Sequence, residues 1–180
     1  MNKRLLVLIG VAAGFTAGSI IAAERDASLY VGVKSCKMCH KKAEEGEQFA
    51  KWQESKHSKA FELLGTPEAK ELGKKAGVED PQKSGKCLKC HSTAYNWTET
   101  VQTQEIPVEE GVSCESCHGP GKNYKKKEIM KVKADAIAQG LIDKPKEFCK
   151  NCHNEQSPTW KGSFDADKMF DKIKHPRPKQ

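Results

Sequence analysis

The eight cysteines of the chain fall into four pairs, and each pair is followed at once by a histidine. Two residues separate the cysteines of every pair, and no cysteine is left over. In chain order the four motifs are Cys36-Lys37-Met38-Cys39-His40, Cys87-Leu88-Lys89-Cys90-His91, Cys114-Glu115-Ser116-Cys117-His118 and Cys149-Lys150-Asn151-Cys152-His153. On a helical turn, two such thiols share one face and can bond the two vinyl groups of a haem, while the following imidazole binds the iron. The pattern therefore predicts four covalently bound haem c groups with four proximal histidine ligands.

Zinc sites and disulfides are the alternatives for paired cysteines. A structural zinc site also combines cysteine pairs with nearby histidines, and cysteines in an exported chain commonly form disulfides. A zinc ribbon, however, does not need a histidine directly after every second cysteine. Because the arrangement recurs four times, it favours haem attachment over both alternatives.

The histidine count limits how the irons are coordinated. The sequence holds six histidines, of which four are proximal ligands, so only His57 and His175 remain for the opposite faces of four irons. At least two haems must therefore take another group or stay open. Methionine, lysine, the α-amino group and water are the other choices, and Met130 and Met169 are either thioether ligands or ordinary packing residues. An open iron would bind nitric oxide, carbon monoxide or a similar small molecule.

Helical patterns between the first and second motifs should position His57. Six residues recur there at helical spacing on the face that also carries His57, and Gly65 stands where the helix would end. These six are Phe49, Trp52, Gln53, Ala60, Phe61 and Leu64. A second helix should start after Thr66 as N-cap, with Pro67 at its first position, and run to about Ala76. Residues 98–106 favour a short strand or hairpin.

The segments after the third motif are also expected to be helical. Gly119-Pro120-Gly121 predicts a tight turn, and a lysine-rich segment follows over residues 122–133. This segment forms either a solvated helix face or a docking surface for an acidic redox partner. Its apolar helical stripe comprises Met130, Ala134, Ile137 and Leu141. A last helix, with Met169, Phe170 and Ile173, should end at His175 because Pro176 disfavours further helix.

Composition indicates that something other than side chains fills the interior. Hydrophobic residues make up 37% of the chain and charged residues 31%, so a purely proteinaceous core would be thin. The expected fold class is mainly α: a compact multihaem cytochrome c, with helices and loops wrapped around four covalently bound haems and little β. Since the motifs are unequally spaced, we expect one domain over residues 24–180 rather than a regular repeat.

Residues 1–23 have the layout of a signal peptide. Lys3 and Arg4 precede an apolar stretch that ends in Ala22-Ala23, a small-residue cleavage site. The alternative is an uncleaved anchor, because the apolar stretch is almost long enough to span a bilayer. In either case the rest of the chain lies outside the cytoplasm, and it meets a membrane only if the segment is retained. The remaining basic residues are mostly lysines with few aromatics among them, so no nucleic-acid partner is expected.

Three blocks of the sequence resemble the tetrahaem cytochrome c-554 family. They are Trp52-Gln-Glu-Ser-Lys-His57-Ser-Lys-Ala-Phe61, Gly111-Val-Ser-Cys-Glu-Ser-Cys-His118-Gly-Pro-Gly-Lys-Asn-Tyr124, and the fourth motif followed by Ser157-Pro-Thr-Trp160-Lys-Gly162. The block around the third motif is the most specific, since haem attachment alone requires neither Gly-Val before it nor Gly-Pro-Gly after it. The resemblance implies a soluble periplasmic electron carrier with closely packed haem pairs. It also implies redox proteins as donor and acceptor, of which hydroxylamine oxidoreductase is the best-known partner of the family.

The resemblance further implies a set of axial ligands. Three haems should have two histidine ligands and one should be five-coordinate. His57 should bind the third haem, at His118, and His175 should bind the first haem, at His40. The second haem, at His91, would be the open one.

The chain departs from the family pattern at one ligand. The family supplies a further distal histidine shortly after the Gly-Pro-Gly turn, for the fourth haem, but residues 124–139 contain none. The fourth haem, at His153, should therefore take a substitute such as Met130 or be open as well. A methionine ligand would raise its potential relative to a second imidazole.

Electron transfer between redox partners is the function that these features predict, with no catalytic residue outside the haems. The protein would tune the haem potentials through axial ligands, burial and nearby charge. The alternative is a small haem reductase that acts on nitric oxide or hydroxylamine at an open iron. A subunit of a cytochrome filament ranks last, because the chain has few spare histidines to ligate across an interface.

Overall fold

The computed structural model describes residues 26–95 and 106–176. Within these two ranges the chain forms helices and turns and no strand, so the predicted mainly α fold class is confirmed. The predicted signal segment lies outside the described residues. So does the predicted strand over residues 98–106, except for Ile106, which lies buried in a bend. No helix in the described part of the chain is long and apolar enough to cross a membrane.

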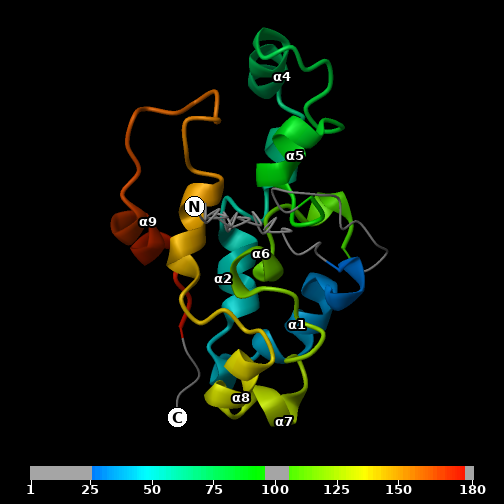
Figure 1. Cartoon of the computed structure of the whole chain (residues 1–180), viewed down its shortest axis with the longest axis vertical. Helices are drawn as coiled ribbons and strands as arrows, with labels where there is room; N and C mark the ends of the chain where they lie inside the picture. Colours follow the sequence, from blue (N-terminus) through cyan, green and yellow to red (C-terminus); the bar gives the residue numbers. More distant parts are fainter. Residues whose placement is uncertain (1–25, 96–105, 177–180) are drawn as a thin grey trace, which may run out of the picture.

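Short helices follow one another along the chain (Figure 1). The α-helices are α1 (Gly32–His40), α2 (Gln48–Glu54), α3 (Ala60–Leu63), α4 (Pro67–Lys75), α5 (Gly85–His91), α6 (Cys114–His118), α7 (Lys127–Met130), α8 (Lys133–Ala138) and α9 (Ala166–Ile173). The 3-10 helices are η1 (Ala27–Leu29), η2 (Ala43–Glu45), η3 (Val108–Glu110) and η4 (Pro145–Asn151).

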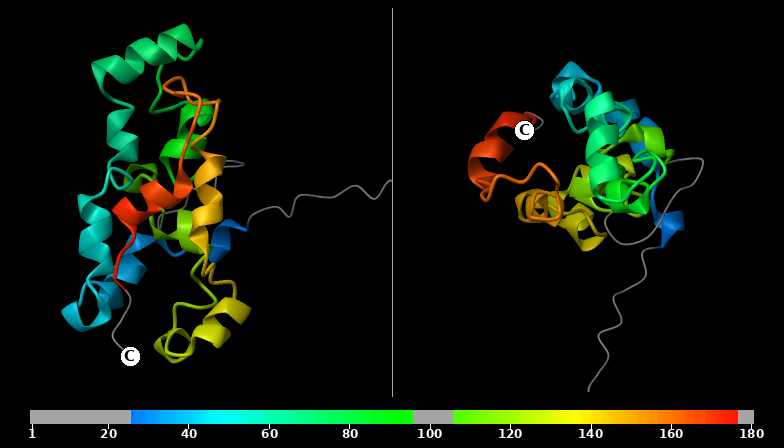
Figure 2. Two further views of the ribbon diagram at one scale, coloured as in Figure 1. Left: turned by 90° about the vertical axis from the view of Figure 1, so that its left-hand side faces the viewer. Right: turned by 90° about the horizontal axis from the view of Figure 1, so that it is seen from above.

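The helices are stacked along one long axis. Helices α4 and α5 occupy one end, the α7–α8 pair occupies the other, and α1, α2 and α6 lie between them (Figures 1 and 2). Helix α1 packs against both α2 and α6, and α6 in turn packs against η4. Helix α9 lies beside η4. Three of the elements that carry cysteine motifs, α1, α6 and η4, are thus neighbours, although they are far apart in the sequence, while α5 with the second motif lies toward one end.

Apolar side chains form only a small core among the described residues. The buried cluster consists of Tyr30, Ala94 and Ile106, with a few half-buried neighbours packed against it. A cluster of this size is too small to stabilise a chain of 180 residues by side-chain burial alone. Cofactors held by thioether bonds would supply the missing apolar contacts, so the thin core fits the composition argument.

The predicted helix around His57 is in fact two helices with a turn between them. Helix α2 ends at Glu54, and Ser55 is extended, with φ −77° and ψ 160°. The Ser58 hydroxyl donates to the carbonyls of Gln53 and Ser55, at 3.0 and 2.8 Å, and such side-chain bonds compete with helical ones. His57 therefore lies in a turn rather than on a helix face.

Local signals predicted the start of α4 correctly and the end of α9 to within two residues. The Thr66 hydroxyl caps α4 by accepting a hydrogen bond from the Ala69 N–H at 3.2 Å, and Pro67 is the first helical residue. Helix α9 ends at Ile173, two residues before His175. Both outcomes follow from signals within a few residues of the helix ends.

The predicted apolar stripe after the third motif is wrong. The segment forms two short helices, α7 and α8, instead of one. Its buried residue is Ala136, which is 1% exposed, whereas Ile137 is 44% exposed. The α7–α8 contact turns the Ala136 face inward, and tertiary packing thus overrides the local pattern.

Candidate haem-binding sites

The four motifs lie on helical turns of two kinds. The first motif ends α1, the second lies in α5 and the third forms α6. The fourth lies in the 3-10 helix η4, where the His153 N–H still donates to the Cys149 carbonyl at 2.9 Å. The α-helical geometry expected for haem attachment is therefore present at three motifs, and the fourth closes its last turn with the same i to i+4 bond.

Three motif histidines have their Nδ1 atom fixed by an acceptor. His40 Nδ1 lies 3.2 Å from Gln48 Oε1, His91 Nδ1 lies 2.9 Å from the Ala60 carbonyl, and His118 Nδ1 lies 3.2 Å from the Ile142 carbonyl. Because these oxygens can only accept, the proton belongs on Nδ1 and the lone pair is on Nε2. This is the tautomer that an axial histidine needs, and the acceptors also fix the ring orientation.

The fourth motif histidine is oriented by an aromatic ring instead. The His153 ring stacks on Phe164, with ring centroids 4.5 Å apart and planes inclined by 8°. Burial lowers the pKa of His153, so the imidazole is neutral at neutral pH, as an iron ligand must be. Burial likewise lowers the pKa of His118 and of His57.

Two pairs of histidine rings lie close together, one pair edge-on and the other tilted. The His57 and His153 ring centroids are 6.1 Å apart, and the His118 and His175 centroids are 5.8 Å apart. Two imidazoles that bind one iron, each through a metal–nitrogen bond of roughly 2 Å, would have centroids roughly 6 Å apart. The residues present therefore fit two irons that each have two histidine ligands.

The histidines pair differently from the arrangement that the resemblance implied. His57 faces His153 rather than His118, and His175 faces His118 rather than His40. The reason is long-range: α9 packs on η4, which brings the C-terminal segment to the third motif. The motifs without a facing histidine are hence the first and the second. The expectation that the fourth haem needs a substitute ligand such as Met130 loses its basis.

The segment that carries His175 is anchored to the start of α2. Gln48 Nε2 donates to the Pro176 carbonyl at 3.0 Å, and His175 Nδ1 lies 3.3 Å from the same oxygen. Gly46 permits this approach: its φ is +97°, and a Cβ there would lie 3.1 Å from that carbonyl oxygen. The contact thus engages His175 Nδ1, and the His175 ring lies beside the ring of His118.

The turn that carries His57 is held by residues just before the third motif. The His57 carbonyl accepts from the Val112 N–H at 3.0 Å, and Trp52 Nε1 donates to the Val112 carbonyl at 2.9 Å. Gly111 has φ +66°, and a Cβ there would lie 2.8 Å from the His57 carbonyl oxygen. The Gly-Val pair before the third motif is thus explained by its contact with the His57 turn.

Glu115 ties the third motif to the first, and sequence reasoning did not identify it. Its carboxylate is 2% exposed and accepts from the backbone N–H groups of Val31, Gly32 and Gly121, at 3.0, 2.9 and 2.6 Å. Burial raises the pKa of Glu115, while the three donors oppose that rise. The residue caps the start of α1 and holds the Gly-Pro-Gly turn against α6. Its position between the two cysteines gave no signal of this role.

Thiols of different motifs lie next to one another. Cys36 of the first motif lies close enough to Cys114 of the third to shift its pKa, and Cys90 of the second does the same with Cys152 of the fourth. Cys117 of the third motif is close to the fourth: burial and the nearby Cys149 together raise its pKa to about 11. These contacts connect the motifs in the spatial order first, third, fourth, second.

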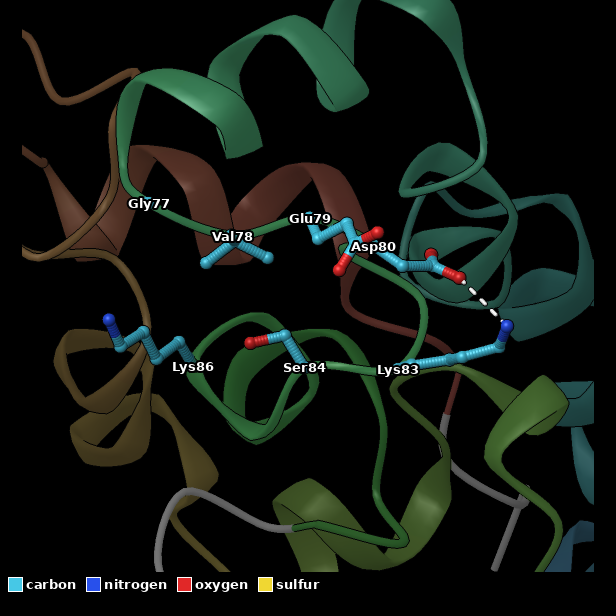
Figure 3. Close-up of a pocket in the computed structure, with 7 residues that line it drawn as sticks. All are labelled: Gly77, Val78, Glu79, Asp80, Lys83, Ser84 and Lys86. Atoms are coloured by element: carbon cyan, nitrogen blue, oxygen red, sulfur yellow. Dashed lines mark ion pairs between the residues drawn. The ribbon is translucent and has the colours of Figure 1, made fainter.

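A separate hollow opens beside the second motif (Figure 3). It has a volume of about 490 Å³ and is lined by residues 77–80 together with Lys83, Ser84 and Lys86. Asp80 and Lys83 form an ion pair of 3.2 Å at its rim. The lining contains no cysteine or histidine, so this hollow is not a haem-attachment site.

Comparison with known proteins agrees with this geometry. The sequence model of the family described as "Cytochrome c554 and c-prime" matches residues 35–119. Cytochrome c-554 of Nitrosomonas europaea is 29% identical, over 89% of this chain and 73% of that protein. No solved structure matches the chain. The motifs and both matches support the cytochrome c-554 family, which implies covalently bound haem c.

Proposed function

We propose that this protein is a periplasmic electron carrier that binds four haem c groups and passes electrons through them between redox partners. The observation that carries the proposal is the close approach of thiols from neighbouring motifs. Haems attached to adjacent thiols lie close together, and a short separation is what electron transfer between cofactors needs. Each haem supplies one-electron redox chemistry, and the protein sets its potential.

The spatial order of the motifs supports a linear path. Electrons would pass from the first haem to the third, then to the fourth and finally to the second, or in the reverse direction. The two inner haems would each have two histidine ligands, His118 with His175 and His153 with His57. Such irons have no free position for a substrate, which supports transfer rather than catalysis along the middle of the path.

Redox proteins are the expected partners, and the end of the molecule at α7 is the proposed docking surface. Lys125, Lys126, Lys127 and Lys131 are exposed there, and Lys125 is close enough to Cys36 of the first motif to lower the pKa of that thiol. An acidic multihaem oxidoreductase, such as hydroxylamine oxidoreductase, fits this positive charge. The first haem would then be the point of electron exchange.

Reversal of lysine charge at each end tests the docking surface. The double variant Lys126→Glu/Lys127→Glu should slow electron exchange with an acidic redox protein at low salt at least tenfold. The matched variant Lys74→Glu/Lys75→Glu, in α4 at the opposite end, should change the rate little. Stopped-flow absorbance at several salt concentrations measures both rates. Equal slowing by the two variants would exclude a specific surface at α7.

Haem stoichiometry and redox titration test the carrier function itself. A pyridine haemochrome assay of the mature protein should give four haems per chain, and all four should be reduced and reoxidised reversibly. Fewer than four haems, or zinc in their place, would overturn the proposal.

A second candidate function is reduction of nitric oxide or hydroxylamine at an iron with a free face. It is favoured by one observation, that no histidine faces His40 or His91. Steady-state turnover of either compound with a chemical reductant would support it. Reversible redox cycling without turnover would support only the carrier function.

A further inference from the structure

We propose that Tyr124 is a positioning residue for the third haem, which holds the backbone of His118 so that the imidazole keeps the orientation in which it binds the iron. The inference deepens the proposed function and rests on it, because it requires a haem at the third motif. Tyr124 follows the Gly-Pro-Gly turn and is neither an attachment cysteine nor a ligand, so the chemistry of the motif does not account for it.

The hydroxyl of Tyr124 closes the end of α6. It donates to the His118 carbonyl at 3.1 Å and to the Gly119 carbonyl at 2.8 Å, so the two oxygens share one proton. His118 is the last residue of α6, where helix geometry leaves carbonyls without an intrahelical donor. The phenol therefore fixes the helix end at the residue that carries the proposed iron ligand.

Tyr124 remains a donor in the folded protein. The residue is 7% exposed, and burial raises its pKa, with the charge of Glu115 acting in the same direction. The phenol therefore keeps its proton at neutral pH. Gly119 is buried as well, and loss of a donor to a buried carbonyl is unfavourable. The hydroxyl is thus a lasting restraint on the end of α6.

The backbone of Ile142 connects this restraint to the imidazole ring. The Ile142 N–H donates to the His118 carbonyl at 3.0 Å, and His118 Nδ1 lies 3.2 Å from the Ile142 carbonyl oxygen. The His118 carbonyl thus receives bonds from Tyr124 and from Ile142, and the same Ile142 peptide group orients the His118 ring. If the hydroxyl of Tyr124 is removed, a shift of the His118 backbone alters the Nδ1 bond too.

The two segments that hold His118 are the two ends of the α7–α8 pair. Tyr124 precedes α7, Ile142 follows α8, and the two helices pack against each other (Figure 1). The pair is therefore attached to His118 on both sides. The part of the molecule proposed as a docking surface is thus also the part that positions a ligand of the third haem.

Packing of the aromatic ring is the alternative role of Tyr124. Cys36 and Cys114 both lie near enough to Tyr124 to contribute to its raised pKa, so the ring fills space beside the first and third motifs. A phenylalanine ring would serve that purpose equally well. The hydroxyl, which packing does not require, therefore separates the two roles in an experiment.

Redox titration and EPR spectroscopy of the full-length holoprotein test the inference with Tyr124→Phe, which removes only the hydroxyl. We expect the potential of one haem to rise, because a loosened His118 donates a weaker hydrogen bond to the Ile142 carbonyl and the imidazole becomes less negative. The largest EPR g value of the same haem should change, since it depends on the angle between the two axial imidazole planes, which is 41° for His118 and His175. The other three potentials should stay as they are.

The affected haem should be the one that His175 binds. Its potential should also rise in His175→Met, and the two effects should be non-additive because both substitutions act on one iron. Replacement of Tyr124 by 3-fluorotyrosine, whose phenol is a stronger donor, should shift the same potential in the opposite direction. Tyr95→Phe is the matched control: it removes the hydroxyl of another partly buried tyrosine, which forms no hydrogen bond within residues 26–95 and 106–176, and it should move no potential.

Three outcomes would overturn the inference. In the first, Tyr124→Phe lowers the Tm but leaves all four potentials unchanged, so the hydroxyl serves stability alone. In the second, the four potentials shift equally, as expected for a general loosening of the fold. In the third, the shift is confined to a haem that His175→Met does not affect. A haem count below four would instead overturn the proposed function, so the two failures are distinguishable.

Discussion

Gln48 Oε1 lies 3.2 Å from His40 Nδ1, while the Nε2 atom of the same side chain lies 3.0 Å from the Pro176 carbonyl. A single buried amide thus connects the proximal histidine of the first motif to the residue that follows His175. The histidines proposed as ligands of the first and third haems are therefore not independent. Any substitution of Gln48 should change the properties of both haems.

The redox potential of the first haem should depend on the strength of the hydrogen bond between His40 Nδ1 and Gln48 Oε1. Gln48→Glu gives His40 a charged acceptor, which increases the negative character of the imidazole, stabilises ferric iron and lowers the potential. Gln48→Leu removes the acceptor and should raise it. A hydrogen bond of this kind contributes about 1 kcal/mol, which corresponds to roughly 40 mV for a one-electron couple. Spectroelectrochemical titration measures the shift, and shifts of the same sign in both variants would contradict the mechanism.

Gly46→Ala should loosen the C-terminal segment. The new Cβ would lie 2.9 Å from Gln48 Nε2 and 3.1 Å from the Pro176 carbonyl oxygen, on a backbone with φ +97°. Left-handed backbone alone costs an alanine about 1 to 2 kcal/mol, and the clash adds to that. We expect a lower Tm and, because His175 moves away from its iron, one more equivalent of bound carbon monoxide.

Gly77→Ala is the matched control for that substitution. Gly77 also has a positive φ, of +68°, but a Cβ there meets nothing within 4 Å. Gly77→Ala should lower the free energy of unfolding only by the cost of a left-handed backbone, and it should leave carbon monoxide uptake unchanged. Equal effects of the two substitutions would show that the contact with Pro176 does not position His175.

The stability of the protein should depend on pH through Glu110. Burial, with a smaller contribution from the charge of Glu115, raises the pKa of Glu110 from 4.5 to about 7, although the Val33 N–H and Lys34 oppose the rise. Between pH 4.5 and 7 the unfolded chain ionises before the folded one does, so the free energy of unfolding falls as the pH rises through this window. Glu110→Gln should remove this dependence and stabilise the protein above pH 7 by about 1 kcal/mol, since the side chain is partly exposed.

Denaturant unfolding at pH 4.5, 6 and 8 measures the effect of Glu110→Gln. Glu109→Gln is the control, because the neighbouring side chain is exposed. The control should leave the pH profile of stability as it is in the parent protein. A profile that stays just as steep in Glu110→Gln would mean that another group causes it.

A double-mutant cycle should locate the haem that His57 binds. His57→Met should raise the potential of one haem, because methionine raises a haem potential relative to a second imidazole. Phe164→Leu should shift the same haem, since Phe164 stacks on His153 at 4.5 Å. The two effects on potential should be non-additive, as expected for groups that share one site.

His175→Met supplies the comparison for that cycle. His175 faces His118 rather than His153, so its substitution should combine additively with Phe164→Leu. Redox titrations of the single and double variants measure both couplings. Coupling of Phe164 to His175 and not to His57 would reverse the proposed ligand assignment.

The chemistry predicted for the motifs stays a prediction, and it rests on local spacing. The spacing of two thiols and one imidazole fits within one helical turn, and the Thr66-Pro67 cap acts within four residues of the start of α4. The mainly α fold and the thin core follow from composition on similar grounds. None of these features requires knowledge of where distant segments meet.

The pairing of the histidines could not be predicted in this way. His57 is nearly one hundred residues from His153, and the choice between possible partners depends on how α9 and the third motif pack around η4. Glu115 was missed for the same reason, since its donors belong to α1 and to the Gly-Pro-Gly turn. Ala136 replaced Ile137 as the buried residue of α8 because the contact with α7 decided which face turned inward.

The close approach of thiols from different motifs has a consequence for maturation. The contact with Cys152 lowers the pKa of Cys90 to about 7, so a large fraction of Cys90 would be thiolate at neutral pH, and thiolate is the form that attacks oxidised sulfur. In an oxidising compartment, an unloaded chain that reached this conformation would cross-link Cys90 to Cys152 and Cys36 to Cys114. Haem insertion must therefore precede compaction of the chain, and the thiols must be kept reduced until each porphyrin has been attached.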